Sequence, residues 1–463
     1  MSTPLLWIIL PTIIGLVLVL FQKRETGVVI AGSLVVLALG IAALQLPMEG
    51  MIGFGPWRTL LVDRMTFAGV QFILSGNDRS MLVTLYATTA FIFGGSLPAR
   101  VQRRFVPVGI MIIGLIIAAL SVEPVVYGVF FFLFAVLLCV FILSPPGKMV
   151  SRGVLRYLIF QIIGLVFIIL GVWSFSDVDA MISDLPGVIV ATLMLGIGFV
   201  CLFAIFPLYA WVTMIAEDDH PYAAMFVFSM MFGAYTLFFL DFLSYYGWLL
   251  EQINIFAIIR FMGVVMAGTG GVWAAFQHNL GRLFGYAVVI GVGYSLLSIG
   301  IQNSDLHNAM LIPQLISLAL WALGLSVLRH HSKDLRFKSV QGMAWQYPVA
   351  SAAVLFAHFS IAGLPLLAGF PVLLTLWSQL ASISTSQAVW SFMGSVGLMA
   401  AGFRSLATFV MSPEPVTLES KEDYSQRIFL ILGIVGIFLF GLFPHWLYPI
   451  FYELGSTLPS FTP

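Results

Sequence analysis

The sequence predicts an all-α, polytopic membrane protein with about fourteen transmembrane helices, and two observations carry that prediction. Hydrophobic residues make up 60% of the 463 residues, whereas charged residues make up only 9%. Soluble domains carry about 25% charged residues, so this chain could not cover itself with a surface that water solvates. The apolar stretches are also continuous rather than alternating, which favours helices over barrel strands.

Apolar stretches long enough for one membrane crossing, roughly 20 residues, recur along the whole chain. The windows that we interpret as spans are 4–22, 27–46, 81–99, 105–122, 124–144, 153–174, 187–215, 221–246, 254–276, 282–302, 306–328, 346–382, 387–410 and 427–452. The twelfth is too long for one straight helix and contains Gly363-Leu364-Pro365 and Gly369-Phe370-Pro371. We therefore expect this helix to be broken, because glycine and proline release backbone groups from the helical pattern.

The distribution of Lys and Arg orients these spans. If the N-terminus lies outside and the chain crosses fourteen times, 16 of the 20 Lys and Arg fall in cytoplasmic loops or at an inner helix end. This asymmetry agrees with the positive-inside rule. We therefore expect a multi-pass protein of the cell (inner) membrane with both termini on the outer, periplasmic side. The stretch 47–80 then forms an external connection, with a short surface helix near 57–66.

Several classes of function lack support in the sequence. A net charge of zero argues against nucleic acid as a partner. Cys139 and Cys201 lie far apart in apolar stretches, so they form no metal or redox motif. No Ser-His-Asp or His-Glu-x-x-His pattern is present, and no segment is long enough to hold a flavin, a nucleotide or an iron–sulfur cluster. We expect no catalytic residue, metal or cofactor, so any enzyme activity would belong to partner subunits.

Ionisable residues at membrane depth are candidates for an ion or proton pathway. His358 lies in the middle of the twelfth span, and an acidic group of Glu217, Asp218, Asp219 and His220 lies at the inner end of the seventh. His358 could relay protons, or it could be a neutral histidine hydrogen-bonded to a carbonyl beside the helix break. The acidic group could collect cations or protons, or it could be a solvated turn before the next helix.

Three motifs in order resemble one known family. They are Phe206-Pro207-Leu208-Tyr209-Ala210-Trp211, the stretch from Gln277 to Tyr286, and Ala362-Gly363-Leu364-Pro365 followed by Gly369-Phe370. Their order and spacing resemble the antiporter-like subunits, which are the proton-translocating membrane subunits of complex I, of related membrane-bound hydrogenases and of Mrp-type cation/proton antiporters. The resemblance covers essentially the whole chain.

The resemblance implies a fold of two inverted five-helix repeats within a single membrane domain, 1–463. The parts would be N-terminal helices in 1–99, a first repeat in 105–246, a second repeat in 254–410 and a last helix in 427–452. Each repeat of the family contains one broken helix. In this sequence these would be the seventh span, at Pro207, and the twelfth, at Pro365.

The family also carries protons along a line of buried Lys, Glu and His at the membrane midplane, and that line is missing here. The matching positions hold Met231, Gly281, Pro313, Ser317 and Leu373, and the position of a family glutamate falls in the apolar run 132–135. None of these side chains titrates. Their loss removes both the proton sites and the charges that shift the pKa values of neighbouring groups.

We therefore predict an antiporter-like membrane subunit of a complex I-related energy-converting complex, of the NADH/quinone or hydrogenase type. Its role would be structural, because its own proton-pumping residues are lost. Its partners would be other membrane subunits and the lipid bilayer. Two alternatives stay open. One is an active subunit that moves protons or cations by a sparse route through His358 and the acidic group. The other is an accessory membrane subunit of an inorganic-carbon or other ion-coupled transport system.

Overall fold

A helix, or a pair of helices, occupies each of the fourteen ranges expected to span the membrane. The computed structural model describes residues 2–54, 57–67, 69–145, 147, 149–175, 185–246, 254–412 and 420–445. Eleven of the ranges hold one helix each: α2 (Glu25–Gln45), α3 (Arg79–Gly94), α4 (Phe105–Ser121), α5 (Gly128–Leu143), α6 (Arg152–Phe175), α9 (Pro221–Tyr245), α11 (Ile255–Ala275), α12 (Leu280–Gly300), α13 (Ser304–His331), α17 (Thr385–Val410) and α18 (Tyr424–Leu442).

The other three ranges are each built from two helical pieces. In the first, a π-helical turn (Leu5–Ile9) continues into α1 (Leu10–Leu20). The seventh consists of α7 (Leu185–Leu202) and α8 (Ala210–Asp218). The twelfth consists of α15 (Pro348–Ala362) and α16 (Gly369–Ile383). The two expected breaks are thus confirmed, and each lies in the fourth helix of its set of five.

The outer surfaces of the helices are apolar, as lipid contact requires. Within the described residues, nine helices are long and apolar enough to cross a membrane, and five shorter apolar helices accompany them. Large side chains such as Leu34 (60% exposed), Trp173 (72%) and Leu432 (62%) lie open on these helices. Such exposed apolar side chains are unusual on a soluble monomer. In a bilayer, the lipid acyl chains solvate them. The chain is a multi-pass membrane protein.

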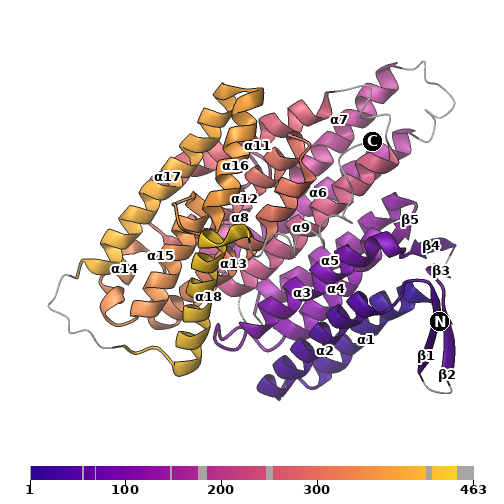
Figure 1. The fold of residues 1–463 in the computed structure, drawn as a ribbon, viewed down its shortest axis with the longest axis horizontal. Coiled ribbons are helices and arrows are strands. Elements are labelled where there is room, and N and C mark those ends of the chain that lie inside the picture. The colour runs from indigo at the N-terminus through magenta and orange to yellow at the C-terminus, as the bar shows by residue number, and fades with distance from the viewer. Residues whose placement is uncertain are drawn as a thin grey trace.

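The helices run roughly parallel to one another, and the strands gather at one end of the molecule beside the N-terminus (Figure 1). A hairpin of β1 (Gly50–Phe54) and β2 (Trp57–Leu61) forms one sheet. The second sheet has the order β3-β4-β5, from β3 (Arg64–Phe67), β4 (Val70–Ile73) and β5 (Val122–Glu123). The last of these precedes a 3₁₀ turn at Val125–Tyr127 that leads into α5.

The surface helix expected near 57–66 is therefore wrong, because this stretch is built of strands. The pairing between β3 and β4 explains the difference. Gly69 adopts a left-handed φ of +84° in the tight turn between these strands, a conformation that suits glycine and closes a hairpin. A second short helical turn, Gly76–Asp78, then leads into α3.

Side chains form hydrogen bonds with backbone groups at both breaks. After α7, the freed carbonyl oxygen of Leu202 accepts a hydrogen bond from Nε2 of Gln161 at 3.4 Å. After α15, Gly363 ends the helix with a left-handed φ of +81°. The amide of Gly369 at the start of α16 donates to Oγ of Ser360 at 3.2 Å. At each break, a neutral side chain thus forms a hydrogen bond with a backbone group.

Two short elements connect α13 to α15, and the last helix packs against both. After α13, the chain forms α14 (Phe337–Val340) and a 3₁₀ turn (Met343–Trp345) before α15 begins. The last helix, α18, packs against α13 and α15. Nε2 of Gln426 in α18 donates to the carbonyl oxygen of Pro98, at 3.1 Å, which ties α18 to the N-terminal helices. The remainder of the predicted last span, 446–452, lies outside the described residues.

Glycines bring α11 and α17 into backbone contact. A Cβ atom on Gly271 of α11 would lie 2.0 Å from the carbonyl oxygen of Gly394 in α17, and a Cβ on Gly394 would lie 2.2 Å from the carbonyl oxygen of Ala267. Small residues allow this approach in membranes, where helix association depends on packing rather than on the hydrophobic effect.

We predict that Gly271→Ala lowers the free energy of unfolding by about 1–3 kcal/mol, because the added methyl group forces the two backbones apart. Thermal unfolding of the purified protein in nanodiscs measures this effect. Gly196→Ala is the matched control, since a Cβ on that helical glycine meets no atom within 4 Å. Equal midpoints for the two variants would contradict the close packing of α11 on α17.

Candidate functional site

His358 is fully buried in α15, where two neighbouring helices hold it. Its Nε2 atom lies 2.8 Å from the carbonyl oxygen of Leu398 in α17, and its ring stacks on Trp321 of α13 with centroids 4.4 Å apart. A carbonyl only accepts hydrogen bonds, so Nε2 carries the proton. Nδ1 has no hydrogen-bond partner among the residues that the structure describes. The geometry holds one neutral tautomer in place.

Three of the positions that carry charge in the resembling family line one small cavity beside the second break. Pro313 and Ser317 of α13 and Leu373 of α16 surround a space of about 30 Å³. Oγ of Ser317 donates to Oγ of Ser360 at 2.9 Å, and both side chains are fully buried. The cavity has room for about two water molecules. Among its described lining residues there is no carboxylate, amine, guanidinium or imidazole group.

The fourth of these positions, Gly281, is a packing position. It lies at the start of α12, where a Cβ would come within 2.5 Å of the carbonyl oxygen of Ala216 and 3.0 Å of Cα of Glu217. One turn later, a Cβ on Gly285 would lie 2.7 Å from Cα of Thr213. The absence of both side chains lets α12 pack directly on α8. A lysine could not enter here without moving one of the helices.

The fifth position, Met231, is also in the core. Its side chain is 2% exposed, and it lies near the middle of α9. Within the apolar run 132–135, Phe132 is also in the core: its fully buried ring packs edge-on against Phe238 with centroids 5.1 Å apart. Apolar side chains thus fill the volume at these positions.

A buried pair of neutral polar side chains lies between α6 and α9. The Tyr235 hydroxyl donates to Oε1 of Gln161 at 2.7 Å, and the same amide supports the Leu202 carbonyl at the first break. A search for charged residues in the sequence does not find this pair, because neither side chain is charged. The signal that could have found it is a glutamine in the middle of an apolar span, where an amide needs a partner.

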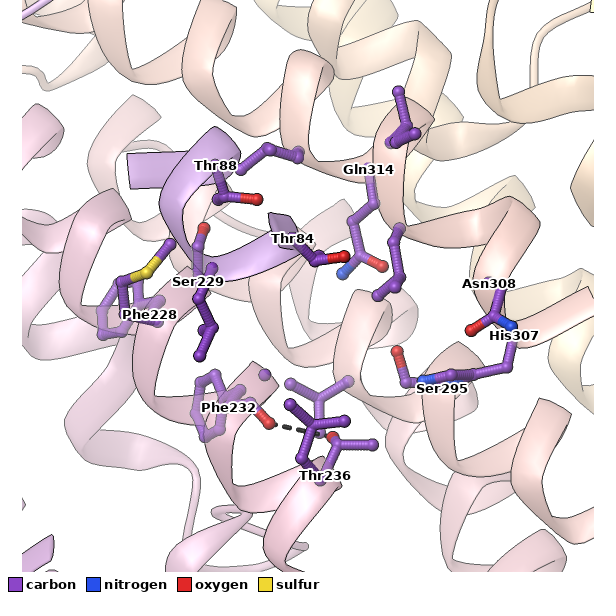
Figure 2. Close-up of a pocket in the computed structure, with 18 of the residues that line it drawn as sticks. Thr84, Thr88, Phe228, Ser229, Phe232, Thr236, Ser295, His307, Asn308 and Gln314 are labelled. Atoms are coloured by element: carbon purple, nitrogen blue, oxygen red, sulfur yellow. Dashed lines mark hydrogen bonds between the residues drawn. The ribbon is translucent and has the colours of Figure 1, made fainter. Parts of the chain in front are cut away.

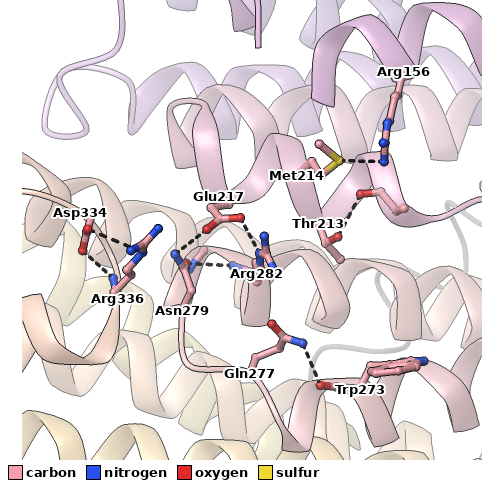
Figure 3. A network of polar contacts seen from close by, with 12 residues as sticks. Arg156, Thr213, Met214, Glu217, Trp273, Gln277, Asn279, Arg282, Asp334 and Arg336 are labelled. Atoms are coloured by element: carbon pink, nitrogen blue, oxygen red, sulfur yellow. Dashed lines mark hydrogen bonds and ion pairs between the residues drawn. The ribbon is translucent and has the colours of Figure 1, made fainter. Parts of the chain in front are cut away.

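Side chains of neighbouring helices bond the acidic group at the end of α8, and Figure 3 shows Glu217 with two of its partners, Asn279 and Arg282. The carboxylate of Glu217 accepts hydrogen bonds from Nδ2 of Asn279, at 3.2 Å, and from Nε of Arg282. The guanidinium of Arg329, near the end of α13, donates to the carbonyl oxygens of Glu217 (3.1 Å), Asp218 (2.5 Å) and Asp219. A cation at a helix C-terminus caps the freed carbonyls and interacts favourably with the helix dipole.

Asp219 lies in the turn between α8 and α9 and is only 9% exposed. Oγ of Ser151 donates to its carboxylate at 2.9 Å. Burial raises the pKa of Asp219 to about 7, and the Asp218 carboxylate adds to this, while the Ser151 hydrogen bond and Arg329 oppose it. His220 follows in the same turn and directly precedes Pro221, the first residue of α9. These contacts link α6, α8, α9, α12 and α13 at one end of the molecule.

The structure does not bring the two candidate groups together. His358 contacts α13 and α17 through Trp321 and Leu398. The acidic group contacts α6 and the ends of α12 and α13. Over the described ranges, no hydrogen bond joins His358 to residues 217–220. The arrangement can hold helices in register, and it does not form a connected chain of titratable groups.

Comparisons with known proteins relate this chain to a family of membrane proteins. Residues 126–403 match the family described as NADH:quinone oxidoreductase/Mrp antiporter, TM. The chain is 25% identical over 389 residues to NADH-quinone oxidoreductase subunit 13 of Thermus thermophilus, covering 79% of each chain. It is 26% identical over 200 residues to NADH-quinone oxidoreductase subunit N of Rickettsia bellii, where the match spans 41% of this chain and 42% of that relative.

A solved structure shows the same fold over nearly the whole length. A chain of the membrane-bound sulfane sulfur reductase, an archaeal respiratory membrane complex, superposes with a TM-score of 0.79 at 13% identity, covering 99% of this chain and 98% of that chain. The helical membrane fold expected from the sequence is confirmed by this likeness.

We predict that Asp219→Asn changes how stability depends on pH. An aspartate has a pKa near 3.9 when unfolded, so between about pH 4 and 7 the folded chain keeps a proton that the unfolded chain releases. The wild type therefore loses stability as the pH rises through this window, and the asparagine variant does not. Unfolding midpoints from pH 4 to 8 should show the variant's advantage growing and then levelling off above pH 7.

The exposed carboxylate variant Asp305→Asn serves as the control for this series. A constant difference between Asp219→Asn and the wild type at every pH would show that Asp219 does not titrate in this window.

We further predict that Arg329→Ala destabilises the protein by about 1.5–3 kcal/mol, because three carbonyl oxygens lose a charged donor. Arg329→Lys should recover only part of this loss, since one ammonium group cannot reproduce the planar fork of donors. Lys333→Ala, on an exposed side chain in the following loop, is the matched control. The capping role is refuted if Arg329→Ala unfolds at the same denaturant concentration as this control.

Proposed function

Because the chain belongs to the NADH:quinone oxidoreductase/Mrp antiporter family of membrane proteins, we propose that it is an antiporter-like subunit of a larger energy-converting complex. Its role in that complex is structural: it seats neighbouring membrane subunits and seals the bilayer, and it moves no protons itself. Both termini lie on the outer side of the membrane, and residues 1–463 form one membrane domain with the two repeats assigned above.

One observation carries this proposal. The five positions that the resemblance matches to proton-carrying side chains of the family hold Met231, Gly281, Pro313, Ser317 and Leu373, and none of these side chains is charged. A restored lysine at Gly281 would meet the backbone of α8 within 2.5 Å of its Cβ. Ser317 instead supports Ser360, which in turn accepts from the first amide of α16.

The remaining polar groups support the same function. A proton crossing the bilayer needs titratable groups or ordered water at close spacing, and apolar walls do not order water. His358 lies between an indole ring and a backbone carbonyl, and the acidic group is engaged in capping and ion pairing. The two are not linked through hydrogen bonds within the part of the chain that the structure describes.

We predict that the double variant His358→Ala, Asp219→Asn leaves the number of protons moved per pair of electrons unchanged in the intact complex. The measurement uses the purified complex in sealed vesicles with an entrapped pH dye, normalised to electron transfer. His278→Ala with Asp334→Asn, at exposed or loop positions, is the matched control. A lower ratio in the first pair alone would establish the sparse proton route through His358 and the acidic group.

The same purification identifies the partners. Subunits of an NADH/quinone or hydrogenase-type complex support the proposal. Recovery of the chain only with proteins of inorganic-carbon uptake, or of another ion-coupled transport system, would replace the proposal by the accessory function.

A further inference from the structure

A second, larger cavity shares one lining residue, Gln314, with the small cavity beside the second break. It has a volume of about 180 Å³ and lies between α3, α9, α12 and α13. It extends from Ser304, the first residue of α13, to Leu318, which lies about four turns along the same helix. It therefore extends over about half the length of α13. Figure 2 shows side chains that line it.

The chemistry of the cavity walls is mixed but carries no fixed charge. The described lining contains no Asp, Glu, Lys or Arg. Most of the wall is apolar, with Leu240, Val292, Leu296, Leu311 and Leu315 among its members. An ion or an anionic headgroup would find no counter-charge inside, so the walls exclude a charged occupant from the interior.

One group of polar side chains interrupts these apolar walls. Thr84 and Thr88 of α3, Ser229 of α9 and Gln314 of α13 all line the cavity, and Figure 2 shows them in its upper part. Oγ of Ser229 donates to Sδ of Met225 at 3.6 Å. The side chains of Thr84, Thr88 and Gln314 make no hydrogen bond within the part of the chain that the structure describes. Two hydroxyl groups and a carboxamide at membrane depth leave hydrogen-bonding capacity that an occupant can satisfy.

The cavity also has free space beside this polar set. A Cβ built on Gly233 of α9 meets no atom within 4 Å, although the residue lies in a helix that is otherwise tightly packed. The rings of Phe228 and Phe232 line the same helix face, and flat aromatic surfaces pack well against a planar or hydrocarbon group. The free space is therefore left by the missing side chain of Gly233, and one substitution at this residue can fill it.

We propose that this cavity binds an uncharged amphiphile dissolved in the bilayer. Its carbonyl or hydroxyl oxygen accepts hydrogen bonds from Gln314 and from Thr84 or Thr88, and its hydrocarbon part lies along the apolar wall. Water alone would satisfy the polar set but would leave the apolar wall without a stabilising partner. A membrane quinone and an uncharged glycerolipid share this chemistry. The inference is independent of the structural function proposed above.

The test begins with the substitution Gly233→Leu, which fills the cavity without a clash at Cβ. Gly196→Leu is the matched control, because that glycine also has no atom within 4 Å of a built Cβ and does not line the cavity. Each purified protein is placed in nanodiscs, and molecules retained by it are extracted with solvent and identified by mass spectrometry. We expect an uncharged amphiphile with the wild type and the control, and its loss in Gly233→Leu.

A second measurement titrates two probes, decylubiquinone and 1,2-dioleoylglycerol, against the wild type and the double variant Thr88→Val, Gln314→Leu. We expect one probe to bind, and to bind about tenfold more weakly to the double variant, which lacks the hydrogen-bond partners of the ligand oxygen. Preference for the first probe identifies a quinone-type head, and preference for the second a glycerolipid. Thr375→Val, on an exposed threonine of α16, should leave binding unchanged.

Three results would overturn the proposal. These are equal retention of the extracted molecule by Gly233→Leu and the wild type, recovery of charged phospholipid only, and the same affinity of both probes for the double variant and the wild type. If neither probe binds and nothing is retained, the cavity holds water only, and the proposal is likewise excluded.

Discussion

A charge buried at the middle of a bilayer needs a partner or water, and both take up space between helices. Several buried positions of this protein hold apolar or small residues that need neither. The ring of Phe132 occupies the core between α5 and α9, and Met231 fills a buried position on α9. Glycines allow α12 to lie directly on α8, and α11 on α17. The close helix packing at these positions and the lack of charge there are therefore two consequences of the same side chains.

Charged residues are used instead at the ends of the helices. Arg329 caps the carbonyl groups that end α8, and Arg282 pairs with Glu217 from the neighbouring helix. At the two broken helices, backbone groups are hydrogen-bonded by the neutral side chains of Gln161 and Ser360. Polar groups thus hold helices together at both the ends and the breaks. This use of polar groups agrees with the structural role proposed for the chain.

Much of this architecture could be predicted from the sequence, because membrane spans depend on local composition. Uninterrupted apolar length marks each of the fourteen ranges, and the Gly363–Pro365 and Gly369–Pro371 pairs mark the second break. The stretch 57–66 was harder to predict, since strand pairing depends on a turn at Gly69 and on a partner strand. The role of Arg329 could not be predicted, because the end of α13 meets the end of α8 only in the folded chain. The cavity beside Gly233 arises from four helices and has no sequence pattern of its own.

If this chain moves no protons, no continuous file of water crosses it. A cryo-electron microscopy map of the chain within its complex, at a resolution that shows ordered water, can decide this. We expect separate pockets of density, with at most about two waters beside Ser317 and none linking His358 to the group at Glu217. A continuous file of ordered water from His358 to that group, and onward to both membrane faces, would contradict this expectation.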